Sequence, residues 1–410
     1  MQKRIKKVGN ELIKGSLVLF VMINIFNFLN YVFHFTMARM LGPIDYGLLA
    51  VLMSVIYIFA VPNEAIQAVV SRIISKFNIK KEFGKMNFVF AKTIGKCLKA
   101  SVICFILFIP IALFLAYFLP DVTFWYLVFT GTILFSIFIL PVVRGTLQGR
   151  KKFKKLGWSM IVESISKLIV SVLLVFLGVK VYGAVAGAVF SIYFSFLISL
   201  FFLKEVTGSK KKKVETSEVR SYSKPIIIAV FVIMIMFSLD IILAKRFFPA
   251  ELAGKYAVAS MLGKMIFFGV VPISKAMFPI TSEDAEKGKK GKSFRQSVIL
   301  VVGGCLVAVA AFFLIPRFII RILFGLDYVE VSGILGFVGL AFGILSVANL
   351  ILLYLLSSNK IKKPMFLAIF PIVQILLLFV FHGTLVQFVL ALILSNIFLL
   401  IFSLFILFKK

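Results

Sequence analysis

Acidic residues are scarce in this chain: 16 Asp and Glu stand against 46 Lys and Arg in 410 residues, a formal net charge of +30. Nucleic-acid-binding proteins also carry such an excess, but they gather it on one folded face. Here the cations recur in every second connection between apolar runs. Positive loops stay on the cytoplasmic side of a membrane. We therefore expect no nucleic-acid partner, an even number of crossings, and both termini on the cytoplasmic side of the plasma (inner) membrane.

Cysteine is also rare, and its positions argue against two kinds of site. Cys97, Cys104 and Cys305 lie within apolar runs or at their inner ends, and none has CxxC spacing. This pattern predicts neither a disulfide framework nor a metal site. The sequence GKS at 291–293 resembles a P-loop ending, but Glu286 stands where the first glycine belongs. We expect no cofactor and no nucleotide as the energy source.

Apolar sequence is abundant. Hydrophobic residues make up 61% of the chain, with 48 Phe and a mean hydropathy of +1.10, whereas a soluble domain is about half apolar. About 20 residues cross the hydrocarbon core of a bilayer. By that measure the chain contains about twelve crossings, near 15–39, 46–70, 95–118, 123–146, 157–178, 182–203, 225–246, 253–278, 297–316, 331–356, 364–382 and 385–407. The sequence therefore predicts an all-α polytopic membrane protein.

One sequence motif occurs twice, at 38–54 and at 244–260. Both copies contain a cation after Ala, then Pro, a carboxylate and Gly: Arg39, Pro43, Asp45 and Gly47 in the first, and Lys245, Pro249, Glu251 and Gly254 in the second. Proline cannot continue a helix, so each copy predicts a tight turn between two crossings. Such repeats are typical of two-lobed transporters with the substrate site between the repeats. We expect two pseudo-symmetric six-helix lobes, 1–205 and 225–410, joined by a basic cytoplasmic linker, 206–224.

Three motifs carry a family resemblance. The first apolar run combines Asn with aromatic residues, the first repeat reads ARMLGPIDYG, and the junction at 144–153 reads RGTLQGRKKF. In these the chain resembles the polysaccharide-transporter branch of the MOP superfamily. That branch comprises the Wzx-type oligosaccharide flippases, relatives of MATE antiporters and the lipid II flippase. The resemblance implies MATE-like lobes around a central cavity that opens alternately to either side of the membrane.

Ionisable residues inside the crossings are the first candidates for function, because each is costly in a bilayer unless it faces the bundle interior. Glu163 and Lys167 are four residues apart, the spacing of a helical ion pair. They either line the cavity or form a structural salt bridge. Tyr256, Ser260 and Lys264 form one polar face, and no carboxylate is near the lysine in sequence. We expect Lys264 to meet an anionic substrate group, and snorkelling to water is the alternative.

A polar stripe on the first crossing supplies further candidates. Asn27, Asn30 and His34 fall within an arc of about 120°, and the repeat places His34 in a position equivalent to Asp240. A histidine titrates near neutrality and burial can raise the pKa of an aspartate toward that range, so this pair suits proton exchange as a cavity changes its exposure. We assign His34 and Asp240 to ion coupling and the two asparagines to substrate binding. A structural interhelical hydrogen bond is the alternative for His34.

Prolines interrupt apolar runs at equivalent places in the two repeats. Pro62 is followed two positions later by Glu64, whereas Pro272 is followed at that place by Ser274. A proline frees a backbone carbonyl one turn earlier, so the two prolines are candidate hinges for a rocking lobe. We place Glu64 with Glu163 among the ion-coupling candidates.

Taken together, these features predict a flippase rather than an enzyme. We expect it to carry a polyprenyl-diphosphate-linked oligosaccharide from the cytoplasmic to the outer leaflet by alternating access, coupled to H⁺ or Na⁺. Arg39, Lys167 and Lys264, with Tyr256, favour an anionic substrate, whereas a drug antiporter of the MATE type favours acidic walls. That antiporter is the alternative, and a membrane glycosyltransferase or polymerase is a minor one. We expect a monomer among membrane lipids, working beside glycan-assembly enzymes.

Overall fold

A computed structural model describes residues 2–214, 224–286, 292–357 and 364–408. Every regular element in these ranges is a helix, as the sequence predicted. The first half contains α1 (Gln2–Phe59), α2 (Pro62–Ile79), α3 (Phe83–Phe118), α4 (Phe124–Gly131), α5 (Ile133–Gly149), α6 (Phe153–Leu174), the π-helical turn η1 (Val175–Val179), α7 (Lys180–Phe201) and α8 (Lys204–Thr207). The second half contains α9 (Lys224–Phe247), α10 (Ala250–Glu286), α11 (Lys292–Leu314), α12 (Pro316–Leu323), the 3-10 turn η2 (Leu326–Val331), α13 (Ser332–Ser357), the 3-10 turn η3 (Pro364–Ala368), α14 (Ile369–Val380) and α15 (Leu385–Phe408).

The predicted crossings lie on these helices, except that 46–70 runs across the break between the end of α1 at Phe59 and the start of α2 at Pro62. Nine stretches of the described residues are long and apolar enough to span a membrane. Two of them, Val21–Phe59 and Phe153–Phe201, each cover most of two predicted crossings, which are separated by breaks at Gly42 and Gly178. The shorter apolar helix Phe366–Val380 adds one more. The described part of the chain therefore accommodates the twelve crossings that the sequence predicted.

The helices form two compact units. Unit 1 comprises Met1–Leu41 and Phe59–Arg220, and unit 2 comprises Gly42–Ile58 and Ser221–Lys410. The later boundary falls inside the predicted linker. Residues 42–58 are the exception to a division into two sequence halves, because this part of α1 packs with unit 2.

The backbone at Gly42 explains why residues 42–58 separate from the first part of α1. Gly42 has φ +73° and ψ 175°, so the α-helix breaks there and Pro43 begins the next helical segment. That segment meets α10 without side chains between them. A Cβ added to Gly47 would lie 2.7 Å from the Cα of Gly254, and one added to Gly254 would lie 1.8 Å from the Pro43 carbonyl oxygen. The two copies of the repeated sequence therefore contact each other directly, backbone against backbone.

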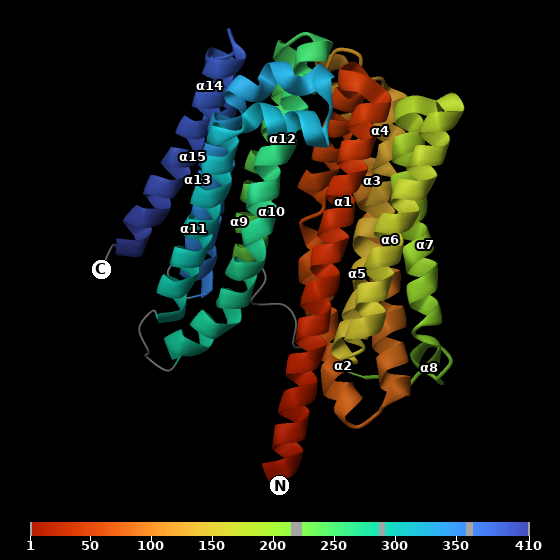
Figure 1. Cartoon of the computed structure of the whole chain (residues 1–410). Helices are drawn as coiled ribbons and strands as arrows, with labels where there is room; N and C mark the ends of the chain where they lie inside the picture. The colour runs from red at the N-terminus through yellow and green to blue at the C-terminus, as the bar shows by residue number, and fades with distance from the viewer. Residues whose placement is uncertain (1, 215–223, 287–291, 358–363, 409–410) are drawn as a thin grey trace. The chain divides into compact units, whose positions relative to one another are not determined.

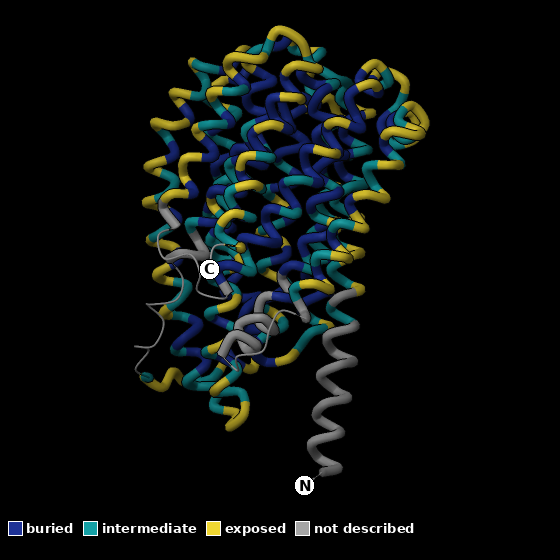
Figure 2. Tube along the Cα trace, turned by 90° about the vertical axis from the view of Figure 1, so that its left-hand side faces the viewer, coloured by how far each residue is buried: buried dark blue, intermediate teal, exposed yellow. Residues whose placement is uncertain are grey.

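Within each unit, burial separates central helices from peripheral ones. In unit 2, α13 packs against α9, α10, α11 and α15, and 78% of its most apolar window is buried, against 22% for α11 (Figure 1). In unit 1, the corresponding fraction for α3 is only 17%. Buried and exposed positions alternate around the helices (Figure 2). Apolar side chains such as Leu107 and Leu306 are exposed on these peripheral helices, as a surface in contact with lipid requires.

Candidate functional site

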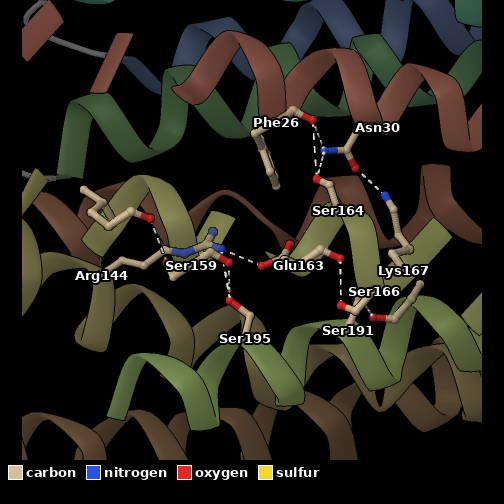
Figure 3. Close-up of polar contacts among 12 residues, drawn as sticks. Phe26, Asn30, Arg144, Ser159, Glu163, Ser164, Ser166, Lys167, Ser191 and Ser195 are labelled. Atoms are coloured by element: carbon tan, nitrogen blue, oxygen red, sulfur yellow. Dashed lines mark hydrogen bonds and ion pairs between the residues drawn. The ribbon is translucent and has the colours of Figure 1, made fainter. Parts of the chain in front are cut away.

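The first polar site lies in unit 1, between α5, α6 and α7. The Arg144 guanidinium donates to the Glu163 carboxylate at 2.5 Å, and both side chains are largely shielded from solvent. The same nitrogen lies 3.5 Å from Ser195 Oγ, which in turn donates to the Ser159 carbonyl oxygen at 2.8 Å (Figure 3). Charge-assisted hydrogen bonds of this kind are among the strongest in proteins. They fix the carboxylate in the interior of the helix bundle.

A second group of contacts continues from the first along α6. The Lys167 ammonium donates to Asn30 Oδ1, and Asn30 Nδ2 donates to Ser164 Oγ at 3.1 Å and to the Phe26 carbonyl oxygen at 2.8 Å (Figure 3). Lys167 Nζ also lies 4.4 Å from the centre of the Phe33 ring. An aromatic face stabilises a cation without neutralising its charge. We call the contacts of Arg144, Glu163, Lys167 and Asn30 the unit 1 network.

Glu163 does not pair with Lys167 as predicted. Arg144, from the packed neighbour α5, takes the carboxylate instead, and Lys167 turns to the amide oxygen of Asn30 on α1. Arg144 is 7% exposed, and a buried guanidinium needs a carboxylate partner, whereas the Asn30 amide and the Phe33 ring stabilise the ammonium of Lys167. The network thus contains two cations and one carboxylate.

The second polar site lies in unit 2. Lys264 Nζ donates to Asp240 Oδ1 at 3.0 Å, and Tyr256 and Ser260 donate to Oδ2, at 3.1 Å for the tyrosine. All four residues are at most 1% exposed, and Lys264 lies 4.9 Å from the centre of the Phe237 ring. Three donors on one carboxylate satisfy most of its hydrogen-bonding capacity. We call these four polar residues the Asp240 cluster.

Lys264 has no carboxylate near it in sequence, but it has one in the fold. Asp240 lies 24 positions earlier, on α9, and helix packing brings the two groups together. The repeat of four along α10 was correctly identified, since Tyr256, Ser260 and Lys264 share one face. That face points at an acid, so an anionic substrate reaches the ammonium only if the ion pair opens.

The remaining predicted residues lie outside these two groups of contacts. Asn27 is partly buried, and His34 is buried with its ring 5.3 Å from that of Phe33. Arg39 and Glu64 are exposed. Pro62 is the first residue of α2, directly after the break that ends α1, whereas α10 continues through Pro272. Sequence reasoning gave no role to Arg144, although an arginine inside an apolar run is itself a signal.

A third ionic group lies beyond the membrane spans, where α8 meets the α5–α6 turn. Arg150 and Lys152 both donate to Glu205, and Lys152 does so at 2.9 Å. The hydrogen bond from Arg150 has the larger effect and that from Lys152 the next, and together they lower the pKa of Glu205 to about 2. Asn87 adds hydrogen bonds to the carbonyl oxygens of Thr207 and Ser209, at 3.2 and 2.6 Å. The start of the predicted linker is thus tied to unit 1.

Comparisons with known proteins identify the family of the chain and its fold. Residues 12–285 match the sequence profile of a family described as "Polysaccharide biosynthesis protein". No curated protein matches the chain. A multidrug resistance MATE transporter of the MOP superfamily, solved in an inward-facing conformation, is similar with TM-score 0.73 at 12% identity, covering 94% of this chain and 97% of that one.

Two further solved structures have the same fold. The eukaryotic MATE transporter AtDTX14 has TM-score 0.67 at 14% identity, with 98% and 96% of the two chains covered. The MATE multidrug transporter DinF-BH has TM-score 0.60 at 17% identity, with 98% and 95% covered. At these identities the likeness concerns the fold alone. It confirms the predicted fold class, since the MATE fold has twelve helices in two lobes.

Proposed function

Because the chain belongs to the polysaccharide biosynthesis protein family, in the MOP superfamily of membrane transporters, we propose that it is a flippase for a lipid-linked oligosaccharide. Its substrate is a polyprenyl diphosphate that carries sugars, moved from the cytoplasmic to the outer leaflet of the plasma membrane by alternating access of two lobes. In this proposal the lobes are the two sequence halves, 1–205 and 225–410, and the linker between them is cytoplasmic.

One observation carries the choice of an anionic substrate. The unit 1 network holds the two cations Arg144 and Lys167 against one carboxylate, Glu163, inside a membrane-spanning bundle. An uncompensated positive charge in such a place is costly unless an anion joins it. A diphosphate supplies that anion, and the amides of Asn27 and Asn30 suit hydroxyl-rich sugars. An organic cation meets repulsion in the same place.

The Asp240 cluster supports coupling to protons. The carboxylate neutralises Lys264 in a site with no exposed surface. Protonation of Asp240 removes that neutralising charge, so the ammonium then favours the approach of an anion. Uptake of a proton and binding of the diphosphate thereby become linked. In this proposal Tyr256 lines the same site, and Arg39 attracts the headgroup. The proton exchange is assisted by His34, Glu64 and Glu163. The helices bend at Pro62 and Pro272 as the lobes move.

A vesicle assay tests the substrate. Purified protein is reconstituted with a fluorescent polyprenyl diphosphate oligosaccharide, and the fraction accessible to an impermeant quencher is followed over time. We expect Lys167→Met to reduce the initial rate at least tenfold because the net positive charge of the network is lost. Lys154→Gln, an exposed lysine at the start of the same helix, is the matched control and keeps the rate. An unchanged rate in Lys167→Met contradicts the proposed site.

The same vesicles test coupling. A pH gradient should accelerate transport by the native protein, and Asp240→Asn, which resembles the protonated state, should retain transport without that acceleration. If Asp240→Asn, Glu64→Gln and His34→Gln all keep the native response to the gradient, proton coupling is wrong. Replacing sodium in the buffer then distinguishes a Na⁺ gradient from removal of the product by glycan-assembly enzymes.

The second candidate is a MATE-like drug antiporter, favoured by the fold of the solved multidrug transporters. Transport of a cationic dye in the same vesicles, with no movement of the oligosaccharide lipid, supports that candidate instead.

Membrane orientation is tested separately. Single cysteines near Gly42 and near Asp121 should react with an impermeant thiol reagent outside the cell, and those near Gly84 and near Lys152 should not. Reaction of the second pair from outside contradicts cytoplasmic termini.

A further inference from the structure

The helix α12 lies between two membrane spans. Phe294–Leu314 precedes it and Leu326–Leu356 follows it, with one to two residues of connection on each side. Figure 1 shows α12 at one end of α11 and α13. Spans of 21 and 31 residues each suffice to cross the hydrocarbon core, so the eight-residue helix between them lies at the bilayer surface.

The side chains of α12 form a buried face, an exposed apolar face and an edge that carries arginines. Ile320 and Phe324 are 0% and 1% exposed and pack into unit 2. Phe318 and Ile322 are 61% and 51% exposed, and they point roughly 160° away from the buried pair at 100° per residue. Exposed apolar chains before and after the helix, at Leu314 and Leu326, extend this surface. An apolar face that points away from the protein at the bilayer surface faces lipid.

Two arginines flank this apolar face. Arg317 and Arg321 are exposed and one helical turn apart, so both guanidinium groups lie along one edge of α12. Among the residues that the structure describes, neither has an ion-pair partner. The nearby Glu330 is held by Lys255 at 2.6 Å. Most connections at this end of the crossings carry few cations, so these two form a local concentration of positive charge.

We propose that α12 is a binding site for anionic phospholipid headgroups, with Arg317 and Arg321 on the phosphate and Phe318 and Ile322 among the acyl chains. The planar guanidinium offers several donors that match phosphate oxygens, and two of them one turn apart span one headgroup. An amphipathic helix with cations at its border binds a bilayer through both apolar and electrostatic contacts. Each arginine near the surface is expected to favour an anionic over a neutral lipid by roughly fivefold.

Lipid-specific fluorescence quenching tests the site. In full-length protein with its three cysteines replaced by Ala, Ile322→Cys is labelled with an environment-sensitive fluorophore and reconstituted in phosphatidylcholine vesicles. A small fraction of the lipid is a quencher-labelled phosphatidylglycerol or, in parallel, quencher-labelled phosphatidylcholine. We expect the anionic quencher to be at least twofold more effective. The matched control is Leu306→Cys on α11, which is also exposed, at 63%, but has no arginine beside it, and its ratio should be about one.

The double variant Arg317→Gln with Arg321→Gln then isolates the charge. It should reduce the ratio at position 322 to about one while both quenchers remain effective, because the apolar face still meets lipid. A ratio of one in the native background overturns the site. So does a ratio that survives the double variant, or a probe at 322 that neither lipid quenches. Oligosaccharide transport is measured independently, so failure here leaves the flippase proposal standing.

Discussion

Removing one partner of the buried pair between Lys264 and Asp240 should destabilise unit 2 far more than removing both. The side chains are 2% and 0% exposed and 3.0 Å apart. In Lys264→Met the carboxylate keeps only the hydroxyl donors of Tyr256 and Ser260. An uncompensated charge in the interior costs about 3–5 kcal/mol. For a unit of this size, that free energy corresponds to a fall in Tm of roughly 6–20 °C.

The double variant Asp240→Asn with Lys264→Met removes the charges together. Replacement of a buried pair by neutral groups of similar volume is often neutral, so we expect its Tm within about 5 °C of the native value, by the same conversion. The assay is thermal unfolding in one detergent at one scan rate, followed by the fluorescence of a thiol-reactive dye at the buried cysteines. The difference between the single and double variants measures the coupling between the two groups.

A matched control lies on the same helix. Lys255 also makes ion pairs, at 2.7 Å to Glu251 and 2.6 Å to Glu330, but both carboxylates are more than half exposed. Lys255→Met should therefore cost no more than about 1 kcal/mol. If Lys264→Met is as stable as this control, or if the double variant loses as much as the two single variants together, the argument from the buried charge is wrong.

Three further expectations follow from contacts elsewhere in the structure. Glu205 has its pKa lowered to about 2, so its contribution to stability is fully present above the unfolded value of about 4.3 and is lost as pH falls through about 2. Because this side chain is 57% exposed, Glu205→Gln should lower stability by at most about 1 kcal/mol at pH 7, and Tm measured against pH should show the two proteins converging as pH falls from about 4 to about 2. Gly254→Ala places a Cβ against the Pro43 carbonyl oxygen and should cost on the order of 1–3 kcal/mol, whereas Gly269→Ala, with no heavy atom within 4 Å of its Cβ, should not lower Tm. Asn30→Ala leaves the buried ammonium of Lys167 without its acceptor and should cost about 1–3 kcal/mol in the same thermal assay. An unchanged Tm would show that this amide does not stabilise unit 1.

Much of the fold followed from the sequence, because the relevant signals are local. An apolar run of about 20 residues spans the bilayer wherever it occurs, and a proline or glycine interrupts a helix through its own backbone. These rules identified the crossings, the turn at Gly42 and an interruption at Pro62, where the structure begins the separate helix α2. The polar face of α10 was likewise a matter of helical period, which is written in the order of residues.

Tertiary structure alone decided which charges neutralise one another. Spacing along α6 suggested Glu163 with Lys167, but the partner of Glu163 comes from α5. No periodicity links Lys264 to Asp240, which lies on another helix. A side chain's partner across a helix interface depends on how each helix is rotated and how deeply it packs, and both are set by many side chains at once. The order of residues therefore determined that charges lie in the membrane, and helix packing determined which of them meet.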